Sequence, residues 1–588
     1  MNNKPTRVFD LAPHQLAHFP TLPMFGNKIG GQWQLTSSKD FIDQIDIISR
    51  GLIALGVKPY DKVGLVSENR VEWNMLDFAI QQVGAVVVAI YPNISDSDYK
   101  YIFNHAEIKI AVVSSQQLYE RITNLRPAIP QLETVFMLDN HATYPNWKQI
   151  HSQAAAIAQD LLIHLRSTIL PEDLATLIYT SGTTGNPKGV MLTHKNLLAD
   201  VMSSTYSFPV QAYQRALSFL PACHAYERVF HYVYMYMGLT IYFAQSMDTI
   251  GLDMKEVKPH IFSAVPRVLE KVYDKIINTG KDLTGIKRRL FFWAIALGER
   301  YSLENRSQAY NMQLYLARKL IFSKWHAALG GEVVGIASGS AALQERLLRV
   351  YLAAGIPIFE GYGLTEASPC LSVNDLKRGI TLGTVGVPLL NITIKLADDG
   401  EILAKGDNIM KGYYKNPEAT AEVIKDGWLH TGDIGEWVNG KFLKIIDRKK
   451  EMFKTSGGKY VVPQAIESKM VESPFIEQFM VIGEGQKFPA ALVVPSYSNL
   501  FEWAKINDIE LSKRSREAFM RSAKVHEMIK SEILHINSKF GQWEQIKKFA
   551  IIPNEFTIEG GELTPTLKMK RKKIIEKYFK NYNEIYNA

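Results

Sequence analysis

The sequence predicts an α/β protein with a large N-terminal domain and a small α+β domain at the C-terminus. Short runs of β-branched residues alternate with helical patterns in the first half, and long helices begin near residue 267. Near residue 450 a run of charged residues followed by glycines interrupts the pattern. Because 588 residues are too many for one compact core, two or more domains are expected.

The first half of the chain has the pattern of a parallel sheet. KVGLVS at residues 62–67 and AVVVAI at residues 85–90 read as buried strands, because almost every position is apolar. Between them, residues 70–82 carry apolar side chains at helical spacing. A strand, a helix and a strand at this spacing predict parallel strands with helices on both faces.

The second half is first helical and then mixed. Apolar residues recur at helical spacing from about residue 267 to 329, and strand patterns return at 333–337 and 356–359. A hairpin is expected at residues 479–482 and 490–494. The five charged residues at 447–451 mark a boundary, which separates an N-terminal domain of residues 1–447 from a C-terminal domain of residues 451–588.

Composition excludes several classes of protein. Apolar residues make up 46% of the chain and charged residues 21%, as in ordinary globular proteins. Two cysteines, Cys223 and Cys370, exclude a disulfide framework and a cysteine-rich metal site. The N-terminus has no apolar core of signal-peptide length, so a cytoplasmic protein is expected. The apolar run 232–243 is too short to span a bilayer.

The net charge of +8 does not by itself identify a binding partner. Such an excess suits anionic lipid, nucleic acid or polyphosphates such as ATP and coenzyme A. A surface rich in lysine with no specific partner explains the charge equally well.

The strongest motif is YTSGTTGNPKG at residues 179–189, directly after an apolar run. A strand that leads into small and hydroxyl residues exposes backbone N–H groups in a concave nest that suits phosphate oxygens. Glycines allow close approach of a ligand, and Lys188 adds a positive charge. The order of residues differs from that of a Walker A loop.

This segment resembles the phosphate loop of the adenylate-forming superfamily, which includes acyl-CoA synthetases, luciferases and nonribosomal peptide adenylation domains. Six further segments resemble that superfamily's motifs in the same order. The resemblance implies a large N-terminal domain of distorted α/β subdomains and a small mobile C-terminal lid. The six segments are LPACHAYER (220–228), SGSA (338–341), EGYGLTE (360–366), GWLHTGD (427–433), DRKKEMFKTSGGKYVVP (447–463) and LTPTLKMKR (563–571).

The resemblance also implies the chemistry. An acid is activated by ATP as its adenylate, and coenzyme A then receives the acyl group. Mg²⁺ and cationic side chains must offset the repulsion between the carboxylate and the ATP phosphates. Glu366 and Thr184 resemble the family's magnesium ligands, and Lys188 its phosphate-binding lysine.

The nucleotide site implied by the resemblance includes the loop and three later motifs. Tyr362 would stack on adenine, Thr365 would contact the α-phosphate, and Asp433 would accept hydrogen bonds from the ribose hydroxyls, with Arg448 beside it. The remaining predicted nucleotide contacts are Thr180, Ser181, Gly182, Thr183, Gly185, Gly339, Glu360, Gly361 and Gly363.

The C-terminal domain contributes a catalytic lysine and a hinge in this family. Lys568 matches the mobile lysine that brings positive charge to the reacting carboxylate, although Leu567 stands where many relatives have glycine. Lys450 matches the hinge position within residues 448–450. His224 resembles a histidine near the acyl site, although a structural role is equally compatible with the sequence. The route of coenzyme A would be lined by Ser456, Gly457, Gly458 and Lys459.

The helical segment after residue 265 resembles long-chain fatty acyl-CoA synthetases more than short-chain or aryl relatives, so a fatty acid is the expected substrate. Transfer to an acyl carrier protein is an alternative, and a catalytically silent binding protein is another. The resemblance implies no nucleic-acid partner. Basic faces in the helical segment suit peripheral association with the inner face of a membrane. The oligomeric state stays open, and a dimer is compatible with the sequence.

Overall fold

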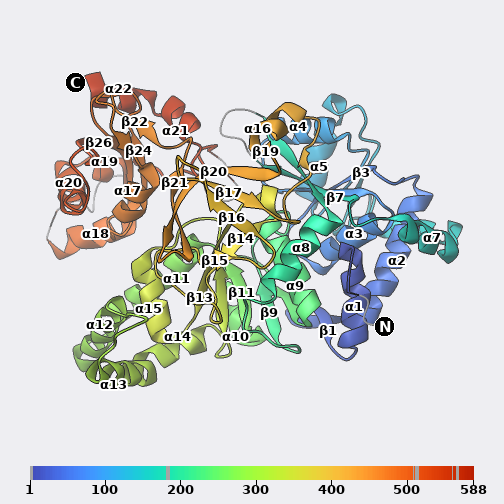
Figure 1. Ribbon diagram of the computed structural model, residues 1–588, viewed down its shortest axis with the longest axis horizontal. Helices are drawn as coiled ribbons and strands as arrows, with labels where there is room; N and C mark the ends of the chain where they lie inside the picture. Colours follow the sequence, from blue (N-terminus) through green and yellow to red (C-terminus); the bar gives the residue numbers. More distant parts are fainter. Residues whose placement is uncertain are drawn as a thin grey trace. The chain divides into compact units, whose positions relative to one another are not determined.

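The computed structural model describes residues 4–180, 186–507, 509, 516–558, 560–564 and 568–587 (Figure 1). The chain forms two compact units. The first unit contains Met1–Lys395, Leu403–His430 and Val438–Leu443, and the second contains Leu396–Ile402, Thr431–Trp437 and Lys444–Ala588. The second unit therefore includes two short segments that precede its main part in the sequence.

The predicted parallel strands lie in a seven-stranded sheet of the first unit. Their register pairs Lys62 with Val86, and the two strands are buried by apolar side chains on both faces. The strand order is β18-β8-β7-β4-β3-β5-β6, in which β8 and β18 are antiparallel to their neighbours. The strands are β3 (Lys62–Val66), β4 (Val86–Ile90), β5 (Ile110–Val113), β6 (Thr134–Met137), β7 (Leu174–Thr180), β8 (Lys188–Thr193) and β18 (Gly412–Tyr413).

A nine-stranded sheet forms the second layer of strands in the first unit. Its order is β15-β14-β13-β12-β11-β9-β10-β1-β2, and the strands from β13 to β1 are parallel. The strands are β1 (Pro23–Ile29), β2 (Gln32–Ser37), β9 (Arg215–Ser218), β10 (Thr240–Phe243), β11 (Ile261–Ala264), β12 (Gly335–Ser338), β13 (Ile358–Gly363), β14 (Cys370–Val373) and β15 (Val387–Pro388).

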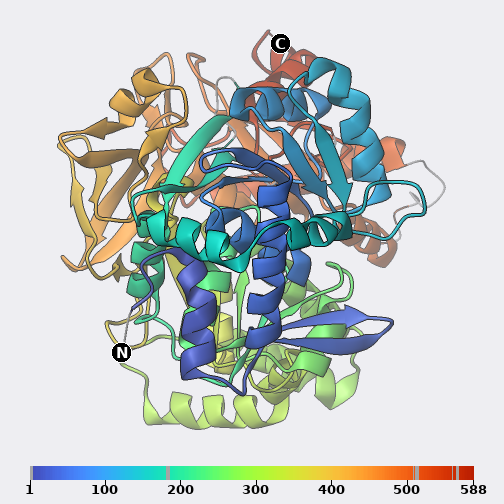
Figure 2. The same cartoon turned by 90° about the vertical axis from the view of Figure 1, so that its right-hand side faces the viewer.

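Helices cover these sheets, as the α/β prediction requires. α1 and α2 pack against each other and are drawn in blue in Figure 2. α3 matches the helix predicted between the first two strands. These helices are α1 (Leu11–His18), α2 (Ser38–Ala54), α3 (Val71–Gln82), α4 (Asp96–Ala106), α5 (Gln116–Leu125), α6 (Lys148–Gln153), α7 (Gln159–Thr168), α8 (His194–Ser204), α10 (Ile250–Val257), α15 (Glu345–Ala354) and α16 (Pro417–Val423).

The helix α9 (Ala225–Met237) is buried along almost its whole length. Its Arg228 forms a fully buried ion pair with Asp77 of α3. The Tyr232 hydroxyl donates to the same carboxylate at 2.5 Å, so the buried charge has several polar partners. This network fixes α9 against α3 inside the core.

The helical segment predicted after residue 265 consists of α11 (Pro266–Lys281), α12 (Gly285–Glu299), α13 (Gln308–Ala317), the π-helical turn η4 (Arg318–Phe322) and α14 (Ser323–Ala328). Leu269 and Tyr273 of the predicted apolar stripe are buried. α13 begins after Ser307, whose side chain accepts a hydrogen bond from the Tyr310 N–H. A cavity of about 460 Å³ in this segment is lined by none of the predicted site residues.

A five-stranded sheet has residues in both units. Its order is β16-β17-β20-β19, with β21 paired to β20. The strands are β16 (Thr393–Leu396), β17 (Glu401–Lys405), β19 (Ile424–Lys425), β20 (Trp428–Val438) and β21 (Phe442–Arg448).

The second unit has an α+β core. The predicted hairpin is present as β24 (Ile476–Ile482) and β25 (Ala490–Pro495), and β26 (Lys548–Ile551) adds a parallel strand. The remaining elements are β22 (Phe453–Lys454), β23 (Tyr460–Val461), α17 (Pro463–Met470), α18 (Tyr497–Ile506), α19 (Arg516–Met520), α20 (Ala523–Asn537), α21 (Arg571–Lys577) and α22 (Phe579–Asn587). Within the part of the chain that the structure describes, no helix combines the length and apolarity needed to cross a bilayer.

Candidate active site

The base of the predicted phosphate loop is a β-hairpin. β7 ends at Thr180, β8 begins at Lys188, and these two residues are paired in antiparallel register. Ser181, Gly182, Thr183, Thr184 and Gly185 lie outside the described residues. The structure therefore places the two ends of the loop, and the roles predicted for its five central residues stay predictions.

Tyr413 contacts both Lys188 and Glu366. The Lys188 ammonium lies 4.8 Å from the centre of the Tyr413 ring, in cation–π geometry. The Tyr413 hydroxyl donates to Glu366 Oε1 at 2.7 Å. Burial and the neighbouring Glu366 raise the pKa of Tyr413, so its hydroxyl keeps its proton and remains a donor. One phenol thus contacts a cation through its ring and a carboxylate through its hydroxyl group.

Backbone pairing explains why Tyr413 reaches this position. β18 pairs with β8, which puts Tyr413 opposite Val190. The Met410 N–H donates to the Glu366 carbonyl at 2.8 Å, so the same segment also holds η5 (Thr365–Ala367), which contains Glu366. No sequence motif predicted the role of Tyr413. The GYY run at 412–414 was the available signal, but nothing local assigns its partner.

The predicted wall of the adenine pocket lies at the carboxyl ends of two adjacent parallel strands. Ser338 of β12 is paired with Glu360 of β13, so Gly339 and Gly361 follow at the same edge of the sheet. Tyr362 and Gly363 complete β13. A Cβ on Gly363 would lie 1.8 Å from the Pro369 carbonyl oxygen, and only glycine fits there. The structure therefore brings together the residues that the resemblance assigns to adenine.

Glu360 is a buried carboxyl group within this wall. Its Oε1 accepts a hydrogen bond from the Leu343 N–H at 3.3 Å. Its Oε2 is buried and has no hydrogen-bond partner among the described residues. Burial raises the pKa of Glu360 from 4.5 to about 8, so the group is mostly protonated at neutral pH. A protonated Glu360 can donate a hydrogen bond as well as accept one.

His224 and Thr365 have local structural roles in the first unit. His224 is the N-cap of α9, and its Nδ1 accepts from the Tyr226 N–H at 3.2 Å. Thr365 is the first residue of η5 and is buried. The cap explains His224 without catalysis, and its predicted role near the acyl site stays a prediction.

The other predicted residues belong to the second unit. Arg448 Nε lies 3.5 Å from Asp433 Oδ1, so the two residues assigned to the ribose are neighbours. The next residue, Lys449, forms ion pairs with Asp399 at 2.6 Å and Glu401 at 2.9 Å. These contacts hold the chain immediately before the exposed Lys450, the predicted hinge residue.

The predicted coenzyme A segment is a hairpin turn between β22 and β23. Ser456, Gly457, Gly458 and Lys459 are all exposed. Gly458 has a φ of +76°, which favours glycine, and its N–H donates to the Thr455 carbonyl at 2.9 Å. The Ser456 N–H donates to the Gln486 carbonyl at 2.8 Å and ties the turn to the α+β core.

Backbone contacts join the residues around Lys568 to residues 563 and 564. Leu563 and Met569 form a β-bridge, and the Thr564 N–H donates to the Lys568 carbonyl at 2.8 Å. Lys568 itself is exposed. Leu567, the departure from the family pattern, lies outside the described residues.

Arg571 anchors the same segment to the second unit. Its Nη2 donates to Glu467 Oε2 at 2.7 Å, and its Nε donates to Glu451 Oε2 at 3.2 Å. Its Nη1 also donates to the Val481 carbonyl of β24 at 3.2 Å. Three contacts on one guanidinium fix the chain three residues after Lys568, and sequence analysis did not predict them.

Comparison with known protein families gives two matches along the chain. The model of the AMP-binding enzyme family matches residues 13–414, and the model of the AMP-binding enzyme C-terminal domain matches residues 451–588.

Curated relatives match the chain almost from end to end. The long-chain-fatty-acid–CoA ligase FadD15 of Mycobacterium bovis is 34% identical, over 97% of this chain and 95% of its own length. The human long-chain-fatty-acid–CoA ligase 1 is 32% identical, over 96% of this chain and 84% of its own length.

Solved structures share the fold at lower identity. The adenylation domain of a carboxylate reductase from Mycobacterium chelonae aligns with a TM-score of 0.76 and 21% identity, over 100% of this chain and 92% of its own. A fatty acyl CoA synthetase of Mycobacterium tuberculosis aligns with a TM-score of 0.64 and 20% identity, over 97% and 98% of the two chains. Family models, relatives and fold agree, and the chain belongs to the family of AMP-binding enzymes.

Proposed function

We propose that this protein is an AMP-forming long-chain fatty acid–CoA ligase. The cluster of Lys188, Tyr413 and Glu366 at the base of the glycine-rich loop carries the proposal. A cation and a carboxylate held together by one side chain, with the cation at the end of the loop, support binding of a triphosphate with its metal ion. The full-length relatives that are named long-chain-fatty-acid–CoA ligases narrow the reaction from adenylation in general to fatty acids and coenzyme A.

In the first half-reaction the fatty acid carboxylate attacks the α-phosphorus of ATP. A new carboxyl oxygen–phosphorus bond forms, the bond to the β-phosphate oxygen breaks, and pyrophosphate leaves. Lys188 and Lys568 supply positive charge that offsets the repulsion between the two anions. Glu360, Gly361 and Tyr362 hold the adenine, while Asp433 accepts hydrogen bonds from the ribose.

A magnesium ion fits the residues present. Glu366 presents a carboxylate fixed by the Tyr413 hydrogen bond, and carboxylate and hydroxyl oxygens are the ligands that Mg²⁺ prefers. Glu366 and Thr184 would hold the ion. When bound, Mg²⁺ neutralises phosphate charge and polarises the phosphoryl group.

In the second half-reaction the thiolate sulfur of coenzyme A attacks the acyl carbon of the adenylate. A carbon–sulfur bond forms, the carbon–oxygen bond to AMP breaks, and AMP leaves. Rotation of residues 451–588 about Lys450 would withdraw Lys568 and bring Ser456, Gly457, Gly458 and Lys459 to the pantetheine. A change of orientation accounts for two half-reactions at one nucleotide site.

The tail of a fatty acid is apolar and partitions into membranes, so the enzyme would meet its substrate at a membrane surface. We include peripheral association with a membrane in the proposed function.

Pyrophosphate release with acids of increasing chain length, with and without coenzyme A, tests the proposal. Acids from decanoate to stearate should have much higher kcat/KM than acetate or benzoate, since each buried CH₂ contributes about 0.8 kcal/mol. Acyl-CoA and AMP should appear only when coenzyme A is present. A preference for acetate or benzoate would remove the long-chain assignment, and pyrophosphate release without any thioester product would remove coenzyme A as the acceptor.

A further inference from the structure

The outer side of the helical segment carries exposed apolar residues that are not packed in the core. On the helix formed by α13, η4 and α14, the buried side chains include Leu314, Phe322 and Trp325. A second apolar stripe on the same helix is exposed, at spacings of three and four residues. This stripe consists of Met312, Tyr315, Leu316 and Leu320, whose exposed fractions lie between 43% and 64%. Two apolar stripes on one helix indicate a second packing partner.

The first turns of α12 extend the exposed apolar surface. Ile286 and Leu290 are exposed there, and α12 contacts η4. We call Ile286, Leu290, Met312, Tyr315, Leu316 and Leu320 the outer face of the helical segment. Exposed apolar residues also occur singly elsewhere, but here they recur along two helices that touch.

Positive charge is concentrated in the same segment. Residues 283–331 contain eight lysines and arginines against two glutamates, and no acidic residue occurs from 305 to 331. Seven of these cations are exposed, among them Lys287, Arg288 and Arg289 on α12 and Lys319 and Lys324 on the helix that carries the stripe. None of these five cations is in an ion pair with another described residue, so no carboxylate in the described part of the chain neutralises them.

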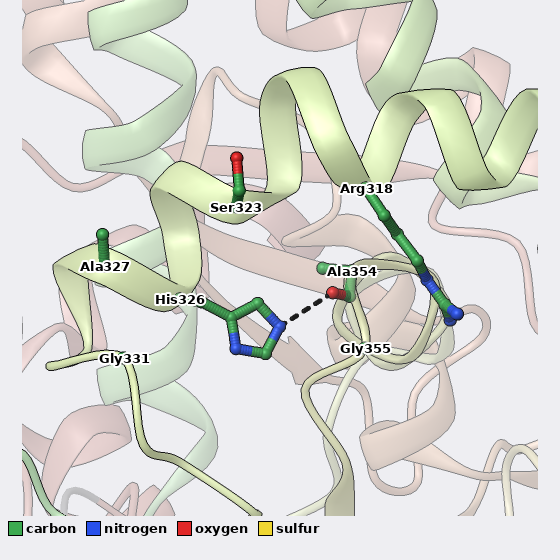
Figure 3. Close-up of a pocket in the computed structure, with 7 residues that line it drawn as sticks. All are labelled: Arg318, Ser323, His326, Ala327, Gly331, Ala354 and Gly355. Carbon is green, nitrogen blue, oxygen red and sulfur yellow. Dashed lines mark hydrogen bonds between the residues drawn. The ribbon is translucent and has the colours of Figure 1, made fainter.

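The helix that carries the stripe is fixed on its other side. Figure 3 shows Arg318 and His326 reaching from this helix to the end of α15. Arg318 Nε donates to the Ala353 carbonyl at 2.8 Å, and His326 Nε2 lies 3.0 Å from the Ala354 carbonyl oxygen. These contacts hold the helix against α15 and leave the stripe toward solvent. The outer face is therefore a rigid surface of the first unit.

We infer that the outer face binds a lipid bilayer with anionic headgroups. Apolar side chains along a helix flanked by unpaired cations are the features of a helix that lies in the membrane interface. A second copy of this chain is a poorer occupant, because a symmetric contact would bring the same cations together. Nucleic acid would use the charge but gain nothing from the apolar stripe.

The inference deepens the proposed function, since it says where on the fold the enzyme would meet membrane-dissolved fatty acid. Binding to lipid and activation of an acid in solution are nevertheless separate measurements. If the protein does not bind vesicles, the measurement of acid activation can still be interpreted, and the reverse also holds.

Co-sedimentation of the full chain with vesicles tests the inference. The probes are phosphatidylcholine vesicles with and without phosphatidylglycerol, at low and high salt. Binding should require phosphatidylglycerol and weaken with salt. The variant Met312→Ser/Leu316→Ser/Leu320→Ser should lower the partition coefficient by about tenfold or more, because its apolar contact with the interface is lost. The variant Lys319→Gln/Lys324→Gln should lower it about fivefold for each charge removed.

A matched control comes from an equally exposed apolar set in the same unit. Leu161, Ile163 and Leu170 have exposed fractions between 42% and 58%, so Leu161→Ser/Ile163→Ser/Leu170→Ser removes similar exposed apolar surface elsewhere. This variant should bind vesicles like the wild type. Both serine variants should keep the wild-type Tm and activate decanoate normally in the absence of vesicles.

Three results would overturn the inference. One is an absence of binding to anionic vesicles by an enzyme that activates decanoate. Another is equal loss of binding in the control variant. The third is a wild-type protein that binds an acidic acyl carrier protein and does not bind vesicles, together with loss of that carrier-protein binding in the Lys319→Gln/Lys324→Gln variant. A protein that binds vesicles through this face but activates no acid would instead contradict the proposed function alone.

Discussion

The Tyr413 hydroxyl donates a 2.7 Å hydrogen bond to Glu366 Oε1, while the same ring lies under the Lys188 ammonium. One phenol thus contacts both the predicted magnesium ligand, Glu366, and the lysine predicted to bind phosphate, Lys188. Because β18 brings Tyr413 to this place, the geometry depends on strand pairing and not on the glycine-rich loop alone.

Tyr413→Phe should weaken magnesium-dependent adenylate formation. It removes a hydrogen bond to a carboxylate, which is worth about tenfold to a hundredfold in an equilibrium or a rate, and keeps the ring beneath Lys188. The Mg²⁺ concentration for half-maximal pyrophosphate release should rise. Glu366→Ala, which removes the carboxylate itself, should lower the rate by on the order of 10²–10³. Tyr414→Phe is the control, and an unchanged Mg²⁺ dependence in Tyr413→Phe would contradict the role of this contact.

Lys568→Ala and Lys450→Pro should separate the two half-reactions. Lys568→Ala should lose adenylation and still convert prepared acyl-adenylate to acyl-CoA. Lys450→Pro should do the reverse, because a proline fixes φ near −65° and removes the torsional freedom that rotation needs. Single-turnover measurements of each half-reaction decide this. Equal loss of both half-reactions in both variants would contradict the two-orientation mechanism.

Arg571→Gln should destabilise the second unit and impair adenylation. Glu467 is buried, and without the guanidinium its charge is uncompensated, which costs on the order of 3 kcal/mol. The measurement is thermal unfolding of the full chain together with pyrophosphate release.

A second variant separates stability from positioning in the Arg571 experiment. Arg571→Gln/Glu467→Gln removes both charges and should recover stability more than activity, since Lys568 still lacks its anchor. Full recovery of adenylation in this double variant would show that Arg571 only stabilises the fold.

Glu360→Gln should make the protein more stable at alkaline pH. Folding raises the pKa of Glu360 from 4.5 to about 8, so between these values the folded chain holds a proton that the unfolded chain has lost. Its contribution to stability is fully present below pH 4.5 and falls as the pH rises toward 8. Glutamine keeps the acceptor for the Leu343 N–H without the ionisation. The slope of Tm against pH between 5 and 8 should flatten in the variant, and Glu304→Gln serves as an exposed control.

Elements whose sequence signal lies within the element itself were predicted correctly. The strands β3 and β4 are buried on both faces, so their runs of β-branched residues could be recognised as strands without knowledge of the neighbouring strands. The hairpin of β24 and β25 and the helical segment after residue 265 have similarly local signals. The superfamily and its fold followed from motifs whose order along the chain is itself a strong signal.

Features that depend on distant pairing could not be predicted. Tyr413 is recognisable only once β18 is seen beside β8, and Arg571 only once α17 brings Glu467 to it. The segments 396–402 and 431–437 belong to the second unit because of their contacts, and a boundary drawn along the sequence cannot include them. The predicted hinge at Lys450 and the roles of residues 181–185 remain predictions.

The late position of β18 in the sequence has a consequence during protein synthesis. Until residues 412 and 413 have left the ribosome, β8 is an open edge of the seven-stranded sheet, with backbone groups that can pair with another chain. A nascent or truncated chain that ends before β18 would be prone to aggregation, and it would contain Lys188 and Glu366 without the residue that joins them. Pairing of β18 with β8 therefore closes this edge of the sheet and at the same time brings Tyr413 into contact with Lys188 and Glu366.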